Sequence, residues 1–281
     1  MLVVDPVHLR SSWQAELALG FERREEKTVL ASRRHRGPLV VQKPLYPEGD
    51  GVCHAIVVHP PAGIAGGDEL AVSARAAKGA HALMTTPGAG RWYRSSGSWA
   101  RQALAFEAGN GACIEWLPQE TIVFDGAAAD LRTEVRLAGN AAFVGWEVLC
   151  LGRTGSGERF ARGECRLRTS VWRDERLLWQ ERGRIEGGGA LMERPAGLGG
   201  RSVCATLCAA ATGLGATDLA RCREVAPAAG ECAVTRLPGV LLARYLGDSS
   251  EAAKRYFVEL WQRLRPAIAG RAAQEPRIWR T

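Results

Sequence analysis

Apolar and polar residues alternate along most of the first 185 residues. The alternation is clearest at residues 130–137, where Leu131, Val135 and Leu137 are separated by charged or hydroxyl-bearing residues. Residues 17–21 show the same pattern, and residues 143–151 and 164–171 resemble it. A period of two places successive side chains on opposite faces of a strand, so that one face packs in a core and the other meets water. The pattern predicts a chain built mainly from short β-strands.

Short segments with turn chemistry separate these strands. Residues 138–140 are Ala-Gly-Asn and residues 153–157 are Arg-Thr-Gly-Ser-Gly, and such residues favour tight turns. A hairpin is predicted between residues 167–172 and 177–180, with its turn at residues 173–176. Strands at a spacing of roughly ten residues are typical of a β-sandwich, a barrel or a solenoid. The chain carries no fixed sequence repeat that would favour the solenoid.

Helical patterns come late in the chain. Residues 203–211, rich in Ala and Cys and followed by Gly213, are expected to form a short buried helix. A longer helix is predicted over residues 249–264, with Asp248 and Glu251 at capping-box spacing and Pro266 as its stop. Its apolar stripe consists of Ala253, Tyr256, Phe257, Leu260, Trp261 and Leu264. This stripe packs either on the sheet or on a partner protein, and core packing is the favoured alternative.

The domain organisation is predicted to be simple. No Ser- or Pro-rich linker divides the chain, so we expect a single domain over residues 1–281. Residues 1–185 would form its β-rich part, and residues 186–281 a loop and helical portion that begins with the glycine-rich stretches 186–191 and 195–200.

Charge and composition narrow the class of protein. The formal net charge of +7 favours an anionic partner. The cations are scattered, however, and no helix-turn-helix, zinc-finger or RNP signature is present, so a basic nucleic-acid-binding protein is only an alternative. No stretch approaches about 18 consecutive apolar residues, which argues against a conventional membrane span. The first residues lack a signal-peptide pattern and the eight cysteines form no Cys-x-x-Cys motif, so we expect a cytoplasmic protein with reduced thiols.

Potential metal ligands gather in one region of the sequence. They are Cys53, His54, His59, Asp68, His81 and Glu115, and their donor types suit nickel, zinc or copper. Cys53 and His54 are adjacent and would face opposite sides of a strand, so they cannot both join one site. Structural roles are therefore favoured over a tight, closed metal site. Cys204 and Cys208 could share a metal on the predicted helix, although small buried thiols are the favoured interpretation.

Other motifs are weak. Residues 85–94 (TTPGAGRWYR) and 213–218 (GLGATD) resemble glycine-rich anion loops but lack the order of a P-loop or dinucleotide fingerprint. No nucleophile elbow, papain-like cysteine context or zinc-protease motif is present. Glu115 and Glu120 could flank a sugar as a glycosidase pair does. A hydrolase of β-rich fold is thus an alternative, and it requires a pocket in which both carboxylates converge.

The stretch HPPAGIAGGD, residues 59–68, is especially rich in proline and glycine. Pro60 and Pro61 stiffen the exit from a strand, and Gly63, Gly66 and Gly67 permit backbone angles that other residues resist. The pattern predicts a shaped loop, and it leaves open whether that loop is a structural turn or a metal site.

Taken in order, these segments resemble one protein family. The segments are GPLVVQKPLYPEG, CHAIVVHPPAGIAGGDEL, TTPGAGRWYRSSG, IEWLPQETIVFDGA, CLGRTGSGERFARG, RYLGDSSEAAKRYFVELWQRLRP and PRIWRT, spanning residues 37–281. They resemble the urease accessory protein D family, named H in some organisms. The resemblance implies a mainly β, solenoid-like or β-helix-like stack of short strands, with a small number of α-helices mostly in the C-terminal third.

The resemblance also implies a function. Members of that family are non-catalytic urease maturation factors that link apo-urease to accessory proteins F and G, the latter a GTPase, and assist nickel delivery through a polar internal passage. We therefore expect no tightly bound cofactor, only transient nickel, and neither a nucleic-acid nor a membrane partner. A conduit needs several weak oxygen-rich contacts rather than a closed cage, because the ion must leave as readily as it enters.

Residue roles follow from the same resemblance. The residues predicted to line the passage are His59, Asp68, Thr85, Thr86, Glu115 and Glu120, with transient nickel at Asp68 and His59. The stretch 59–68 then becomes a rigid bend that presents Asp68, and an Asp68→Ala change is expected to lower nickel loading while the fold stays intact. Partner contacts are predicted at Trp92, Tyr93, Arg94, Arg277 and Trp279, because exposed aromatic and arginine side chains anchor interfaces. A core position is the alternative for Trp92.

Overall fold

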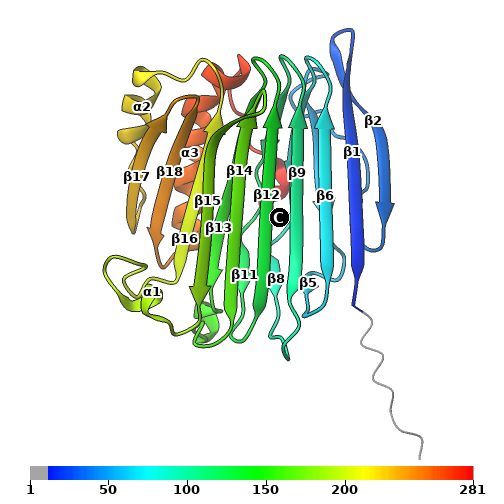
Figure 1. Ribbon diagram of the computed structural model, residues 1–281. Helices are drawn as coiled ribbons and strands as arrows, with labels where there is room; N and C mark the ends of the chain where they lie inside the picture. Colours follow the sequence, from blue (N-terminus) through cyan, green and yellow to red (C-terminus); the bar gives the residue numbers. More distant parts are fainter. Residues whose placement is uncertain (1–11, 281) are drawn as a thin grey trace, which may run out of the picture.

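The computed structural model describes residues 12–280 and contains two stacked β-sheets (Figure 1). The seven-stranded sheet has the order β15 (Arg176–Glu186), β14 (Glu164–Arg173), β12 (Ala128–Leu137), β9 (Ala100–Ala108), β6 (Glu69–Ala76), β1 (Gln14–Arg24) and β2 (Lys27–Arg36). Its five inner strands run parallel, and the two edge strands pair antiparallel.

The eleven-stranded sheet faces the first one. Its main order is β17 (Glu231–Leu237), β18 (Val240–Gly247), β16 (Val203–Ala210), β13 (Ala142–Leu151), β10 (Cys113–Trp116), β7 (His81–Thr85), β4 (Cys53–Val58) and β3 (Val40–Val41). Three short strands, β5 (Gly63–Ile64), β8 (Gly90–Trp92) and β11 (Thr121–Val123), pair with one another and join the sheet at β13. Strands β4, β7, β10 and β13 are parallel.

The chain winds between the two sheets as a solenoid. It passes from β6 to β7, then through β8 to β9 and β10, and through β11 to β12 and β13, so that each coil adds a strand to both sheets. The turns of neighbouring coils stack: the Gly79 amide donates to the Asn110 carbonyl, and the Asn140 amide donates to the Asn110 side chain. The solenoid-like fold expected from the family resemblance is confirmed. The coils differ in length, which explains why no fixed repeat is visible in the sequence.

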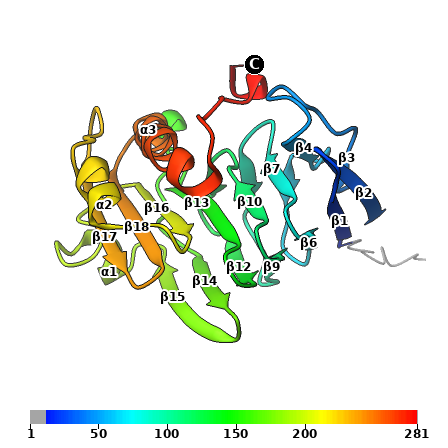
Figure 2. The same ribbon diagram turned by 90° about the horizontal axis from the view of Figure 1, so that it is seen from above.

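Two apolar layers hold the fold together. One lies between the sheets and is formed by the inward positions of alternating strands, such as Leu131 and Val135 of β12. The other lies between the eleven-stranded sheet and helix α3 (Ser250–Ala269) (Figure 2). The remaining helices are α1 (Ala190–Glu193) and α2 (Ala216–Arg223), with short 3-10 segments at Thr154–Ser156 and Arg277–Arg280. In the part described, no helix is both long and apolar enough to span a membrane.

Most predicted elements are confirmed. The alternating segments are strands β1, β12, β13 and β14, and the predicted hairpin joins β14 to β15 with Asp174 and Glu175 in the left-handed region. The predicted long helix is α3, and its apolar stripe is buried against the chain's own sheet. The prediction of its ends needs correction. Ser249 is the N-cap, accepting from the Ala252 amide, while Asp248 bonds to Arg201 and Ser202.

Pro266 does not stop the helix. The proline lies inside α3, which continues to Ala269 and ends at Gly270 in the left-handed conformation, with the Gly270 amide donating to the Pro266 carbonyl. A proline this close to a C-terminus removes a single backbone hydrogen bond and leaves only one further turn to form.

The predicted helix at residues 203–211 is wrong. This segment forms strand β16, which pairs on both sides with antiparallel neighbours β13 and β18. A strand buried on both faces has no polar alternation, so an Ala- and Cys-rich run cannot be assigned from its periodicity. Strands β16, β17 and β18 also show that residues 186–281 are not only loop and helix.

Candidate functional site

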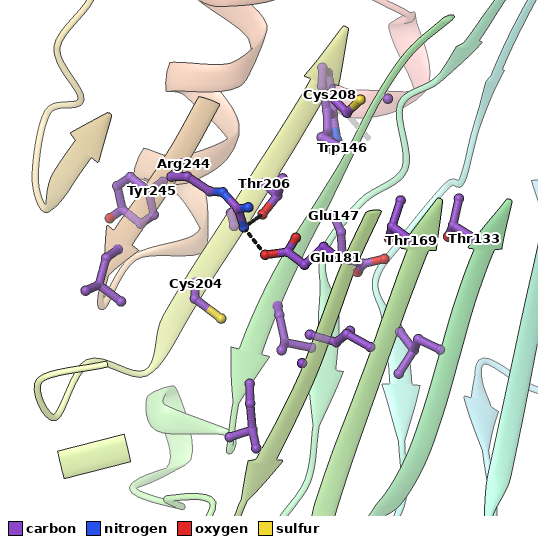
Figure 3. Close-up of a pocket in the computed structure, with 18 of the residues that line it drawn as sticks. Thr133, Trp146, Glu147, Thr169, Glu181, Cys204, Thr206, Cys208, Arg244 and Tyr245 are labelled. Atoms are coloured by element: carbon purple, nitrogen blue, oxygen red, sulfur yellow. Dashed lines mark hydrogen bonds and ion pairs between the residues drawn. The ribbon is translucent and has the colours of Figure 1, made fainter. Parts of the chain in front are cut away.

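A cavity of about 370 Å³ lies between the two sheets. Strands β12, β14 and β15 form one wall, and β13, β16 and β18 form most of the other (Figure 3). Most lining side chains are apolar, among them Leu131, Leu149, Leu167 and Ile185. The polar groups therefore stand out, and the labelled ones are Thr133, Glu147, Thr169, Glu181, Cys204, Thr206 and Arg244.

Glu147 is the most unusual of these groups. It lies on β13 with the same parity as Phe143 and Leu149, whose side chains belong to the inter-sheet core. Its buried Oε1 atom has no hydrogen-bond partner among the described residues. Burial raises the pKa of Glu147 to about 7, although a hydrogen bond with Thr121 acts in the opposite direction. A buried carboxyl oxygen without a partner is costly, and such groups mark candidate functional sites.

An ion pair bridges the two sheets at this cavity. Arg244 of β18 donates from Nη1 to Glu181 of β15 at 2.6 Å and to the Thr206 hydroxyl of β16 at 2.8 Å (Figure 3). Both charged side chains are partly exposed, so the pair lies where the cavity meets solvent. The arrangement places one carboxylate at the opening and another, Glu147, among the buried side chains.

Two cysteines of β16 also line the cavity. Cys204 and Cys208 flank Thr206 on the inward face of the strand. Burial raises the pKa of each thiol to about 12, so both are neutral near pH 7. Because this segment is a strand, residues four apart are about 13 Å from each other, and the two sulfurs cannot share one metal ion.

The predicted passage residues lie elsewhere in the fold. His59 follows β4, and burial lowers its pKa despite the charge of Asp68; its Nε2 atom has no partner within residues 12–280. Asp68 is buried and accepts the backbone amides of Trp13 and Ala65, each at 2.8 Å. The stretch 59–68 is therefore held as a turn by its own aspartate. None of the six predicted passage residues lines the inter-sheet cavity.

Thr85 and Thr86 end strand β7 beside the C-terminal segment. The Thr85 hydroxyl donates to the Leu117 carbonyl at 2.6 Å and accepts the indole N–H of Trp279 at 2.8 Å. Thr86 accepts the Gln119 amide at 2.9 Å. Both hydroxyls thus connect segments of the chain to each other.

Glu115 belongs to a buried ion network beneath α3. It accepts hydrogen bonds from Arg265 at both oxygens, from His81 at 2.6 Å and from the Trp261 indole at 2.5 Å. Arg265 also reaches Glu48, which pairs with His54 at 2.6 Å. Burial alone would raise the pKa of Glu115, but His81 and Arg265 lower it to about 2.

His81, Cys113 and Glu115 bring three potential ligand atoms within 4.8 Å of one another. Burial would lower the pKa of His81, but Cys113 and Glu115 raise it to about 10, so its ring carries a proton near pH 7. Both oxygens of Glu115 already accept hydrogen bonds from Arg265, which places a positive charge beside the three ligand atoms. The cluster therefore suits an ion network better than a metal. The same bonds leave Glu115 unable to meet Glu120 at a sugar substrate.

The predicted partner residues differ in exposure. Trp92 is buried between the sheets, which supports the core alternative for this residue. Tyr93 is exposed and contacts Phe124 edge-on, and Arg94 is largely exposed beside Asp125. Arg277 is exposed.

Trp279 packs on the chain itself. Its ring lies 5.8 Å from that of Trp146 and 6.0 Å from that of Trp261, and Lys254 lies over its face. The C-terminal segment is thus attached to α3 and the eleven-stranded sheet.

Comparison with known proteins identifies the family. Residues 14–280 match the family described as UreD urease accessory protein. The chain is 60% identical to the urease accessory protein UreD of Azoarcus sp. (strain BH72), covering 96% of this chain and 94% of that protein. It is 55% identical to the protein of the same name from Dechloromonas aromatica (strain RCB), covering 96% and 95%. The chain belongs to the UreD urease accessory protein family.

Sequence reasoning missed the polar groups that this family member places between its sheets. Glu147 is the only acidic residue in the apolar segment FVGWEVLCL, and its parity with Phe143 and Leu149 indicates an inward position. That signal was available in the sequence. Cys204 and Thr206 could not be placed, because their segment was assigned to a helix.

Proposed function

We propose that this chain is a non-catalytic urease maturation factor. It links apo-urease to accessory proteins F and G and assists the delivery of nickel, which passes between the two sheets as cargo. The observation that carries this proposal is the inter-sheet cavity, in which one buried carboxyl oxygen of Glu147 has no partner among the described residues. Membership of the UreD family supports the role in urease maturation.

The chemistry of the cavity suits a passing cation. Carboxylates and hydroxyls can replace part of the hydration shell of a divalent ion, and the apolar walls do not compete for it. Glu147 inside the cavity supplies one such position, and Glu181 at the opening supplies a second when the ion displaces its partner Arg244. Because few donors converge at any point, binding is weak enough for release. We expect no submicromolar nickel affinity, and a titration that found one would contradict a conduit.

The six passage residues predicted from the sequence stay a prediction. Of these, Asp68, Thr85, Thr86 and Glu115 are engaged in bonds that hold segments of the chain together. We therefore test the cavity first, and we test partner contacts at the exposed residues Tyr93, Arg94 and Arg277.

The experiment is co-production of the full chain with apo-urease and accessory proteins F and G. The wild-type chain should co-purify with these proteins and raise the nickel content of urease. Glu147→Gln keeps the side-chain shape and removes the ionisable group, so nickel loading should fall while the complex is retained. Glu134→Gln, on the outer face of β12, is the matched control and should load urease normally. If none of the three proteins co-purifies with the chain, the proposed role as a scaffold is refuted. If Glu147→Gln loads urease with nickel as fully as the wild type does, the proposed passage through the cavity is refuted.

A further inference from the structure

The outer face of the seven-stranded sheet is exposed. Helices α2 and α3 lie over the eleven-stranded sheet, and within residues 12–280 no helix covers the opposite face (Figure 2). Parallel sheets usually have both faces covered by other elements. This face is therefore a broad surface on which side chains from neighbouring strands stand in rows.

One row on this face consists of three arginines. Arg132 of β12 is in register with Arg168 of β14, which is in register with Arg182 of β15. All three side chains are exposed on the face opposite Leu131, Leu167 and Ile185. Directly opposite side chains in a sheet have Cβ atoms about 4.5–5.5 Å apart, and like charges at this distance are destabilising.

Two members of the row lack a counter-charge. Arg132 pairs with Asp130 at 2.6 Å. Arg168 and Arg182 form no ion pair with any residue in the part of the chain described. The surface thus holds two adjacent guanidinium groups that repel each other and whose donors are free for another molecule.

The neighbouring row shows how the same strands avoid this repulsion. Arg166 and Arg184 are also directly opposite each other, but Glu164 accepts from both, at 2.6 Å and 2.9 Å. Arg184 has a second partner in Glu186 at 2.6 Å. Acidic residues on these strands therefore neutralise the pair Arg166 and Arg184, whereas no acidic residue within residues 12–280 neutralises Arg168 and Arg182.

We propose that Arg132, Arg168 and Arg182 form a docking site for an acidic segment of a protein partner in the maturation complex. This inference rests on the proposed function for the identity of the partner. Guanidinium groups bind carboxylates through two parallel hydrogen bonds, and the exposed row presents them at the spacing of adjacent strands. The acidic residues near the row, Glu134 and Glu164, are neutralised by arginines of their own, so the uncompensated positive charge is confined to Arg168 and Arg182 and does not continue along the strands. A discrete set of carboxylates fits this pattern better than a nucleic acid does.

The test compares two double variants of the full chain. Arg168→Ala with Arg182→Ala removes the unpaired guanidiniums. Arg166→Ala with Arg184→Ala removes the same charge from the same strands and is the matched control. Thermal unfolding should show no loss of stability in the first variant, because it removes repulsion. Each is co-produced with apo-urease and accessory proteins F and G, and each is titrated with a fluorescent oligoglutamate peptide and a short DNA duplex.

The first variant should lose at least one of the three proteins, and its peptide affinity should fall about tenfold at physiological salt, with a smaller difference at high salt. The control variant should retain all three proteins and its affinity for the peptide. Equal behaviour of the two variants overturns the proposal, as does a larger effect on the duplex than on the peptide. If the first variant binds the peptide less tightly but still retains all three proteins, the partner that docks on this row does not belong to the maturation complex. If the wild-type chain captures none of the proteins, the proposed function fails, and the peptide titration alone decides whether the row binds acidic segments.

Discussion

Replacing Arg265 by methionine is expected to destabilise this chain more than any change at an exposed ion pair. The Arg265 side chain is fully buried and donates to both oxygens of Glu115, both oxygens of Glu48 and the Ala272 carbonyl. Methionine fills a similar length without charge. The two carboxylates stay buried, Glu115 with His81 and the Trp261 indole as partners and Glu48 with His54.

The magnitude follows from this burial. Removing one partner of a buried ion pair costs about 3–5 kcal/mol, because the remaining charge is left without compensation. For a domain of this size, that loss lowers the melting temperature by roughly 5–9 °C. Adding Glu48→Gln to Arg265→Met removes the excess negative charge, because Glu115 keeps the charged ring of His81 as its partner, so the double variant should recover about 1 kcal/mol or more.

Circular dichroism on heating is the assay, with Arg263→Met as the matched control. Arg263 lies two residues earlier in α3 and pairs with Glu259 and Glu224 at the surface, so its replacement should cost less than about 1 kcal/mol. A melting temperature for Arg265→Met within about 2 °C of the control would refute the reasoning. It would mean that the buried network contributes no more than surface pairs do.

Three further predictions concern single groups. Asp68→Ala should lower the melting temperature as well as any nickel loading, because the amides of Trp13 and Ala65 lose their buried acceptor at a cost of about 2–4 kcal/mol; unchanged unfolding would restore a purely functional role. Trp279→Ala should cost about 2–4 kcal/mol through lost packing on Trp146 and Trp261, so a variant that only weakens complex assembly, with normal unfolding, would contradict this. Stability should fall as the pH rises from about 6.5 towards 10, because the raised pKa of His81 means that its charged form stabilises the folded state below that range. His81→Gln should flatten this dependence in unfolding measured across the pH range.

Particular elements show how far the sequence could be interpreted. Strand β12 and helix α3 were predictable because each has one buried and one exposed face, which imposes a period of two or 3.6 on the residues. Strand β16 was not, because both of its faces are buried and its small residues are compatible with either structure.

For the candidate sites, too, the sequence predicted some features and could not predict others. Glu115 was singled out by its motif, but its role could not be predicted, since the residues that hold it are Arg265 and Trp261, far along the chain. The Asp68 turn was correctly located as a shaped loop, while its bond to Trp13 depends on how β1 and β6 pair. Contacts between distant segments arise from sheet order, which local patterns do not encode.

The sequence by itself determined the family, the mainly β class, the helix at the C-terminal end and the turn at HPPAGIAGGD. Each of these depends on residues close to one another, where backbone propensity and side-chain period act directly. The tertiary structure alone decided that one buried oxygen of Glu147 has no partner among the described residues and that Arg265 neutralises Glu48 and Glu115. It also decided that Arg168 and Arg182 stand side by side without a counter-charge. These properties depend on which strands become neighbours, and that choice is made by the burial of the whole core rather than by any one segment.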